Sequence, residues 1–118
     1  RSVVGQCGYL ISRILYEKIS YNKRFLILDS GMNNLIRPAL YNSRHKISNI
    51  SVKNKDYMYY DIVGPICEST DTFAKNYRLP SSSRGDLVAI HSCGAYAESM
   101  SSNFNLRDNI KSYFSDTI

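Results

Sequence analysis

The sequence predicts a single, mainly β domain over residues 1–118, folded as an antiparallel, Greek-key-like barrel or sandwich with short helical turns. Three observations support this fold class. Several short segments are rich in β-branched and aromatic residues, clusters of turn-forming residues separate them, and a hydrophobic content of 43% is enough for one modest core. Short strands with turns between them are typical of an antiparallel sheet or barrel.

The first half of the chain is expected to form a β-hairpin and then an irregular segment. Residues 9–20 (YLISRILYEKIS) alternate in part between apolar and polar positions, which favours a strand, although a helix also fits part of the pattern. Residues 21–23 form a turn, and residues 24–29 (RFLILD) are an almost wholly apolar run typical of a buried strand. Pro38 would disrupt a long helix over residues 33–40, so one helical turn or an ordered loop is expected there.

The second half contains three more segments with the character of strands. Apolar residues recur between polar ones over residues 45–52, and the turn cluster at residues 53–56 precedes a strand-like run at residues 57–63 (YMYYDIV). The turn cluster at residues 81–86 precedes another strand at residues 87–92 (LVAIHS). The pattern therefore predicts five strands joined by polar turns.

Composition excludes several classes of protein. The formal net charge is +5, but the lysines and arginines form no run longer than two, so a solvated mixed surface is favoured over a nucleic-acid-binding face. No apolar stretch is long enough to cross a bilayer, and no secretion signal opens the chain. We therefore expect neither a nucleic-acid partner nor a membrane.

The cysteines and histidines indicate a reducing compartment and no metal site. Cys7, Cys67 and Cys93 are an odd number at wide spacings, which fits neither a disulfide framework nor a CxxC motif, so a cytoplasmic location is expected. His45 and His91 have no companion at ligand spacing. Motifs of P-loop proteins, dinucleotide-binding domains and serine hydrolases are absent from the sequence.

A thiol and two carboxylates lie in the segment at residues 64–71 (GPICESTD), directly after a predicted strand. Functional residues collect in such irregular segments on a rigid scaffold. Cys67 is a candidate proton donor or nucleophile, and Glu68 or Asp71 is a candidate partner for a cationic group. Spacing alone favours a plainer interpretation, in which the cysteine is buried and Ser69 or Asp71 caps a helix.

Two further segments carry candidate binding residues. Arg37 and Tyr41 together offer the donors for a carboxylate or phosphate, although a surface arginine over a packed tyrosine is the simpler alternative. Residues 94–105 begin with a glycine and continue with small polar residues that can approach a ligand, and Tyr96 can face an aromatic or phosphorylated cofactor. A turn followed by an amphipathic helical turn is the alternative there.

Four stretches resemble, in the same order, C-terminal motifs of the diaminopimelate decarboxylase family of fold-type III pyridoxal-phosphate enzymes. They lie at residues 1–4 (RSVV), 29–41 (DSGMNNLIRPALY), 64–71 and 94–105. The resemblance implies the C-terminal β-domain of an enzyme that converts meso-diaminopimelate to L-lysine and carbon dioxide in lysine biosynthesis. It also implies that most contacts to pyridoxal 5'-phosphate come from an upstream barrel domain, without which this sheet is incomplete and the fragment inactive.

The resemblance assigns roles to six side chains. It implies that Arg1, Arg37 and Tyr41 hold the distal carboxylate of the substrate, and that Glu68 pairs with the distal ammonium. Cys67 resembles the catalytic proton donor, and the family resemblance places it and Glu68 across the interface of a homodimer. Tyr96 resembles the tyrosine that contacts both substrate and cofactor.

The match is incomplete in two places. The chain begins at Arg1 rather than a methionine, as a fragment would, and the tail at residues 106–118 departs from the family pattern. A related decarboxylase of ornithine, lysine or arginine is an alternative, as is a noncatalytic remnant or a small basic binding module. Arg37 favours the diamino-diacid substrate, because the other substrates lack a distal carboxylate.

Overall fold

The computed structural model describes residues 7–41, 44–52, 56–66, 70–94, 100–102 and 111–113. Tyr41 is described by its backbone alone. Within these ranges the chain forms six strands and one short helix, and no helix there is long and apolar enough to cross a membrane. The elements are β1 (Leu10–Ser20), β2 (Lys23–Leu28), α1 (Arg37–Tyr41), β3 (Ile47–Asn49), β4 (Tyr57–Val63), β5 (Thr72–Pro80) and β6 (Leu87–Ile90).

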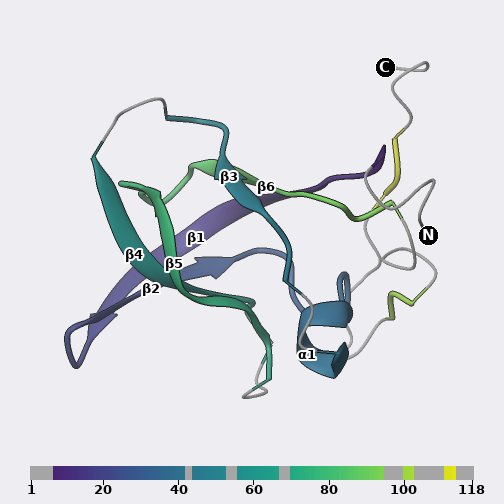
Figure 1. The fold of residues 1–118 in the computed structure, drawn as a ribbon, viewed down its shortest axis with the longest axis horizontal. Coiled ribbons are helices and arrows are strands. Elements are labelled where there is room, and N and C mark those ends of the chain that lie inside the picture. Colours follow the sequence, from purple (N-terminus) through teal and green to yellow (C-terminus); the bar gives the residue numbers. More distant parts are fainter. Residues whose placement is uncertain are drawn as a thin grey trace.

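All six strands belong to one strongly curved sheet with the order β3-β6-β1-β2-β4-β5 (Figure 1). The sheet almost closes into a barrel, because the hydroxyl of Tyr77 on edge strand β5 accepts a hydrogen bond of 2.9 Å from the backbone N–H of Ile47 on the other edge strand, β3. The predicted mainly β class is confirmed. One pairing differs from the expected antiparallel pattern, since β2 and β4 run parallel.

The core fills the inside of this curved sheet. Alternate side chains of each strand point inward, as the period of two in a β-strand requires. Leu26, Leu28 and Ile62 are completely buried and come from the neighbouring strands β2 and β4. The rest of the core cluster is Leu10, Ile14, Leu35, Ile47, Tyr60, Phe73, Leu79, Val88 and Ile90.

The predicted hairpin between β1 and β2 is confirmed. Tyr21 and Asn22 both have positive φ, at 50° and 65°, which is the requirement of the two-residue turn whose twist matches that of the flanking strands. The register between the strands shifts at Leu15. This bulge lets the first part of β1 pair with β6 and the second part with β2.

The pattern did not predict strand β5. Phe73 and Leu79 are buried near its two ends, but between them Asn76 has a φ of 50° and the register opposite β4 shifts. The N–H of Asn76 bonds to the carboxylate of Asp61 instead of a backbone carbonyl, at 2.8 Å. This bulge interrupts the alternation on which the prediction of a strand depends.

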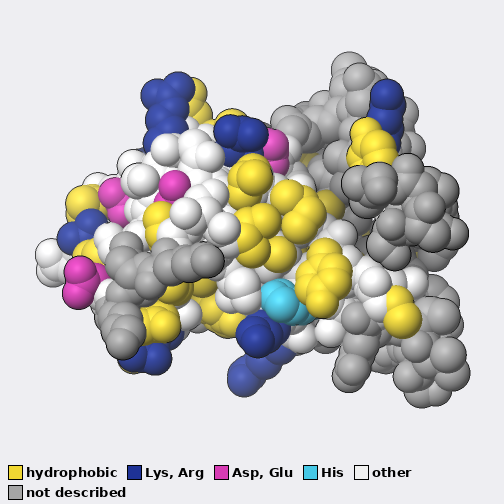
Figure 2. Space-filling view, turned by 90° about the horizontal axis from the view of Figure 1, so that it is seen from above, with side chains coloured by type: hydrophobic (Ala, Val, Ile, Leu, Met, Phe, Trp, Pro, Cys, Tyr) yellow, Lys and Arg dark blue, Asp and Glu magenta, His cyan; other side chains and the backbone are white. Residues whose placement is uncertain are grey.

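Two predicted strands are shorter in the structure. The run at residues 45–52 contains only β3, because the side-chain oxygen of Asn49 accepts the N–H groups of Ser51 and Val52 and turns the chain out of the sheet. The run at residues 87–92 contains only β6, and Ser92 beyond it has a φ of 62°. On the face seen in Figure 2 the lysine and arginine side chains are dispersed rather than gathered into one patch.

Candidate active-site loops

The loop between β4 and β5 is held to the turn after β2 by the buried carboxylate of Asp71, which is 3% exposed. One oxygen, Oδ1, accepts a hydrogen bond of 2.7 Å from the backbone N–H of Met32, and the other, Oδ2, accepts one of 2.7 Å from the N–H of Ile66. Charge-assisted bonds of this kind are stronger than neutral ones. Asp71 therefore links two segments that lie 39 residues apart in the sequence.

The turn after β2 is itself tightly bonded. The carbonyl of Gly31 accepts from the N–H groups of Asn34 and Leu35, at 2.9 and 3.2 Å, while the side-chain oxygen of Asn34 accepts from the N–H of Gly31 at 3.1 Å. Leu35 is almost completely buried in the core. The turn thus leads directly from the sheet into α1, whose first residue is Arg37.

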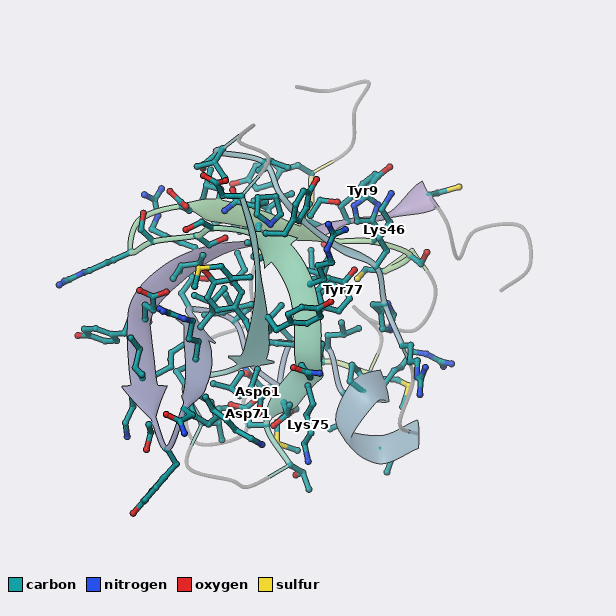
Figure 3. The ribbon with its side chains drawn as sticks, turned by 60° about the vertical axis from the view of Figure 1, so that its left-hand side comes forward. Tyr9, Lys46, Asp61, Asp71, Lys75 and Tyr77 are labelled. Carbon is teal, nitrogen blue, oxygen red and sulfur yellow. The ribbon has the colours of Figure 1, made fainter. Side chains whose placement is uncertain are left out.

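A third segment joins the same turn. The N–H of Ser102 bonds to the carbonyl of Asn33 at 2.8 Å, and the side-chain amide of Asn33 points to the carbonyl of Ser102 at 3.5 Å. The structure therefore brings together parts of three motif segments, those at residues 29–41, 64–71 and 94–105. Figure 3 shows Asp71 toward one end of the barrel, with Tyr9 and Lys46 toward the other.

Two glycines permit this close approach. A Cβ on Gly64 would overlap the carboxylate of Asp71, and a Cβ on Gly31 would lie 3.2 Å from Asp71 Oδ1 and 3.0 Å from the side chain of Ile66. The N–H of Gly64 also bonds to the backbone carbonyl of Asp71 at 3.0 Å. Any larger side chain at these positions must displace a loop or its carboxylate.

The start of the turn is fixed to β1 by a small polar network. Ser12 donates to the carboxylate of Asp29 at 2.6 Å, and the hydroxyl of Ser30 donates to Ser12 at 2.7 Å. Asp29 also accepts from the N–H of Arg13 at 2.9 Å. The buried hydroxyl groups are therefore satisfied at the exact point where the chain leaves the sheet.

Two of the six predicted site residues lie within the described part of the chain. Arg37 is half-buried at the start of α1, with Pro38 at the second position, where its fixed φ suits a helix. Tyr41 ends the helix one turn later, so of the two expected alternatives, one helical turn or an ordered loop, the structure has the helical turn. The other four residues, Arg1, Cys67, Glu68 and Tyr96, lie outside the described residues.

No sequence pattern indicates the role of Asp71 as an acceptor of backbone N–H groups. It was expected to bind a cation or to cap a helix, but helix capping is wrong, because strand β5 begins at the next residue. Two buried atoms nearby, Asn33 Oδ1 and Asn34 Nδ2, have no hydrogen-bond partner in the described structure. The Asn33-Asn34 pair shortly after a buried strand is a weak sequence signal for polar contacts of this kind.

The described residues contain no metal cluster, and the thiol of Cys93 is not activated. No group of three His, Cys, Asp or Glu side chains gathers in the parts of the chain that the structure describes. Burial raises the pKa of the Cys93 thiol to about 11, against a smaller lowering by its backbone hydrogen bond with Leu10. Cys93 is therefore a neutral packing residue near neutral pH.

Comparison with known proteins agrees with this geometry. Residues 2–94 match the family model described as "Pyridoxal-dependent decarboxylase, C-terminal sheet domain". The chain therefore belongs to the pyridoxal-dependent decarboxylases, and its sheet corresponds to the C-terminal sheet domain of that family. Among these enzymes its curated relatives are diaminopimelate decarboxylases, such as the one from Bacteroides thetaiotaomicron, which is 52% identical over the whole chain.

Solved structures of such relatives have the same fold. The diaminopimelate decarboxylase from Helicobacter pylori complexed with L-lysine matches 92% of this chain at 46% identity, with a TM-score of 0.84. The enzyme from M. jannaschii matches 92% at 37% identity, with a TM-score of 0.88. A lysine/ornithine decarboxylase from Vibrio vulnificus, at 21% identity and a TM-score of 0.81, shows the fold alone.

The chain is much shorter than these relatives. It spans 30% of the length of the Bacteroides thetaiotaomicron enzyme and 27% of a Helicobacter pylori enzyme to which it is 48% identical. The matched region is thus one domain of a larger enzyme in each relative.

Proposed function

We propose that this chain supplies the C-terminal substrate-binding and dimer-interface part of a diaminopimelate decarboxylase. The full enzyme converts meso-diaminopimelate to L-lysine and carbon dioxide in lysine biosynthesis. The observation that carries the proposal is the meeting of three motif segments at Asp71, Met32 and Ser102, at the loop end of a rigid barrel. Identity of 42–52% to diaminopimelate decarboxylases supports the same substrate.

Substrate selection rests on cationic and hydroxyl donors. Arg1, Arg37 and Tyr41 bind the distal carboxylate, with guanidinium groups that match its two oxygens. A substrate without that carboxylate would leave these donors unpaired in a partly desolvated site, which favours meso-diaminopimelate over ornithine, lysine or arginine. Glu68 binds the distal ammonium.

The proposed chemical contribution of the chain is one proton. Cys67 donates it to the carbon that has lost its carboxylate, and in the proposed homodimer Cys67 and Glu68 act in the active site of the neighbouring subunit. A positioned acid of this kind contributes roughly 10²- to 10⁴-fold to a rate. We propose a cytoplasmic location, in keeping with the reduced cysteines that such chemistry needs.

The family is pyridoxal-dependent, and we propose that the cofactor is pyridoxal 5'-phosphate. When bound, it supplies the electron sink for decarboxylation. Asp71 is an anion that would repel a phosphate, and its two oxygens already accept backbone N–H groups, while the proposal assigns Arg37 to the substrate. Most cofactor contacts are therefore assigned to the part of the larger enzyme that this chain does not span, with Tyr96 as the contact from this chain.

A chimaera tests the proposal. It joins the part of the Helicobacter pylori enzyme that precedes the matched region to this chain, and the intact Helicobacter pylori enzyme is the positive control. Carbon dioxide release is measured with meso-diaminopimelate, L-ornithine, L-lysine and L-arginine as competing substrates. We expect a kcat/KM for meso-diaminopimelate at least about 100-fold above the others, since unpaired buried donors reject a substrate strongly. Preference for ornithine would overturn the assignment.

A further inference from the structure

The geometry points to Asp71 as a positioning residue for the proposed active site. Its carboxylate fixes the loop that contains Cys67 and Glu68 in a set relation to the turn that leads to Arg37. This inference rests on the proposed function, because it explains how two groups of proposed site residues keep their geometry. Asp71 itself is not assigned a contact with the substrate.

The carboxylate of Asp71 uses both of its oxygens to hold the two loops. Both carboxylate oxygens are engaged, each at 2.7 Å, and each by the backbone of a different loop. Because the donors are main-chain N–H groups, the contact fixes the path of the chain rather than one rotamer. A group that is 3% exposed has little water to replace a lost partner.

The two backbone donors lie close in the sequence to the proposed site residues. Ile66 directly precedes Cys67 in the sequence, and Asp71 itself ends the same motif. Consecutive Cα atoms are about 3.8 Å apart, so an anchored residue restricts the next one strongly. Met32 lies on the tightly bonded turn that leads into α1 and Arg37.

Two glycines leave the space that the carboxylate of Asp71 occupies. There is room for the Asp71 carboxylate beside Gly64 only because Gly64 lacks a Cβ, and a Cβ on Gly31 would lie 3.2 Å from Oδ1. Thr70 adds a weaker link between the same two loops, since its hydroxyl lies 3.9 Å from the sulfur of Met32. The loops are thus built around one carboxylate.

The substitution Asp71→Asn is the sharpest test. It keeps the size of the side chain but replaces one acceptor oxygen by an NH₂ group, which then faces a backbone N–H donor. Asp86→Asn is the matched control, because Asp86 also accepts a backbone N–H through its carboxylate, from Ser83 at 3.0 Å, but in the turn at the other end of β5. Both variants are made in the chimaera described above.

The first readout is hydrogen exchange, which does not depend on activity. Peptides covering residues 30–34 and 64–67 should exchange at least about tenfold faster in Asp71→Asn, since a bond to a charged group is lost, and should be unchanged in Asp86→Asn. If Asp71→Asn does not fold, Gly64→Ala serves instead, because its Cβ displaces the carboxylate while the charge is retained. Unchanged exchange in both loops would overturn the inference.

The second readout separates positioning from general stability. We expect kcat/KM per folded active site to fall about ten- to a hundredfold in Asp71→Asn and less than about threefold in Asp86→Asn. Combined with Cys67→Ala, the Asp71→Asn change should cost much less than it does alone, because the acid that it positions is already absent. Equal and additive effects would contradict a positioning role.

The two readouts also separate this inference from the proposed function. A parent chimaera that folds but does not decarboxylate meso-diaminopimelate contradicts the proposed function, while the exchange measurement still decides whether Asp71 holds the two loops together. An active parent whose Asp71→Asn variant behaves like Asp86→Asn overturns the inference and leaves the proposed function intact.

Discussion

The two ends of strand β5 use the same chemical device for different purposes. At one end Asp71 accepts backbone N–H groups from Met32 and Ile66, and at the other Asp86 accepts from the N–H of Ser83 and the side chain of Asn49. The nine residues of β5 separate these ends by roughly 25–30 Å at the usual rise per residue.

The difference lies in what each carboxylate connects. Asp86 closes its own turn, and with Ser82 of the same turn it accepts hydrogen bonds from Asn49 on β3, which ties the β5–β6 turn to an edge strand of the sheet. Asp71 connects two loops that carry motif residues, at the end of the barrel where the chain leaves the sheet. One end of the barrel therefore stabilises the sheet, and in the proposed function the other end holds the geometry of the site.

The largest expected effect tests the chemistry at the Asp71 end. In the chimaera, Cys67→Ala should lower kcat by about 10²- to 10⁴-fold with little change in the thermal midpoint, because a positioned acid is lost and no residue of the described core is changed. Steady-state kinetics with meso-diaminopimelate and a thermal melt measure the two quantities. Cys7→Ser, at an exposed cysteine, is the control and should leave kcat unchanged. A Cys67→Ala enzyme with the same kcat as the parent would contradict the proposed role of Cys67 as the proton donor.

The next largest effect is on the free energy of unfolding, and it tests the sheet core that lies between the two ends. Leu28 is completely buried, so Leu28→Ala should lower the free energy of unfolding by about 2–5 kcal/mol through lost burial and the cavity left behind. Ile19 on the neighbouring strand is 62% exposed, and Ile19→Ala should change the free energy of unfolding by less than about 0.5 kcal/mol. Thermal or urea unfolding of the chimaera checks both. Similar losses for the two variants would mean that this sheet is not the stable core.

A smaller effect on selectivity sharpens the contrast between arginines at the two ends. Arg37→Lys replaces a two-pronged guanidinium by a single ammonium, so kcat/KM for meso-diaminopimelate should fall about ten- to a hundredfold. Arg84 lies over the ring of Tyr16 at 5.1 Å in the turn at the Asp86 end, and Arg84→Lys is the matched control. Competition between meso-diaminopimelate and L-lysine as substrates measures the selectivity. Equal effects of the two changes would argue against a substrate-binding role for Arg37.

The smallest effect is a dependence of stability on pH. The folded state raises the pKa of Cys93 from 9.0 to about 11, so the folded protein holds a proton that the unfolded chain releases in this range. This contribution is complete below pH 9 and is lost as the pH rises toward 11. The thermal midpoint of the chimaera should therefore fall less steeply over this range in Cys93→Ala than in the parent. Parallel curves for the two proteins would show that the thiol makes no such contribution.

Local patterns predicted most of the strands but not all of their pairings. The runs that became β1, β2, β4 and β6 carry enough consecutive apolar or β-branched residues to be visible without the fold. Strand β5 was missed because the bulge at Asn76 breaks its alternation, and that bulge is stabilised by Asp61 on another strand. The parallel pairing of β2 and β4 depends on how the chain crosses between them, which no local period encodes.

The candidate site was predictable to a similar extent. Motif resemblance named Arg37 and Tyr41, the pattern around Pro38 predicted one helical turn or an ordered loop, and the helical turn is present. The assignments of Arg1, Cys67, Glu68 and Tyr96 stay predictions, as does the departure of the tail at residues 106–118. Nothing in the spacing of the sequence indicated that Asp71 accepts N–H groups from two loops.

By itself the sequence determined that this protein is a β-rich domain with a small core, and its ordered motifs determined which family it resembles. Only the tertiary structure decided which strands are neighbours and which backbone groups Asp71 binds. The physical reason is the separation of the interacting residues along the sequence. Alternation of apolar residues is a property of adjacent positions, whereas the N–H of Met32 bonds to an acceptor 39 residues away, on a loop that the folded barrel places beside it.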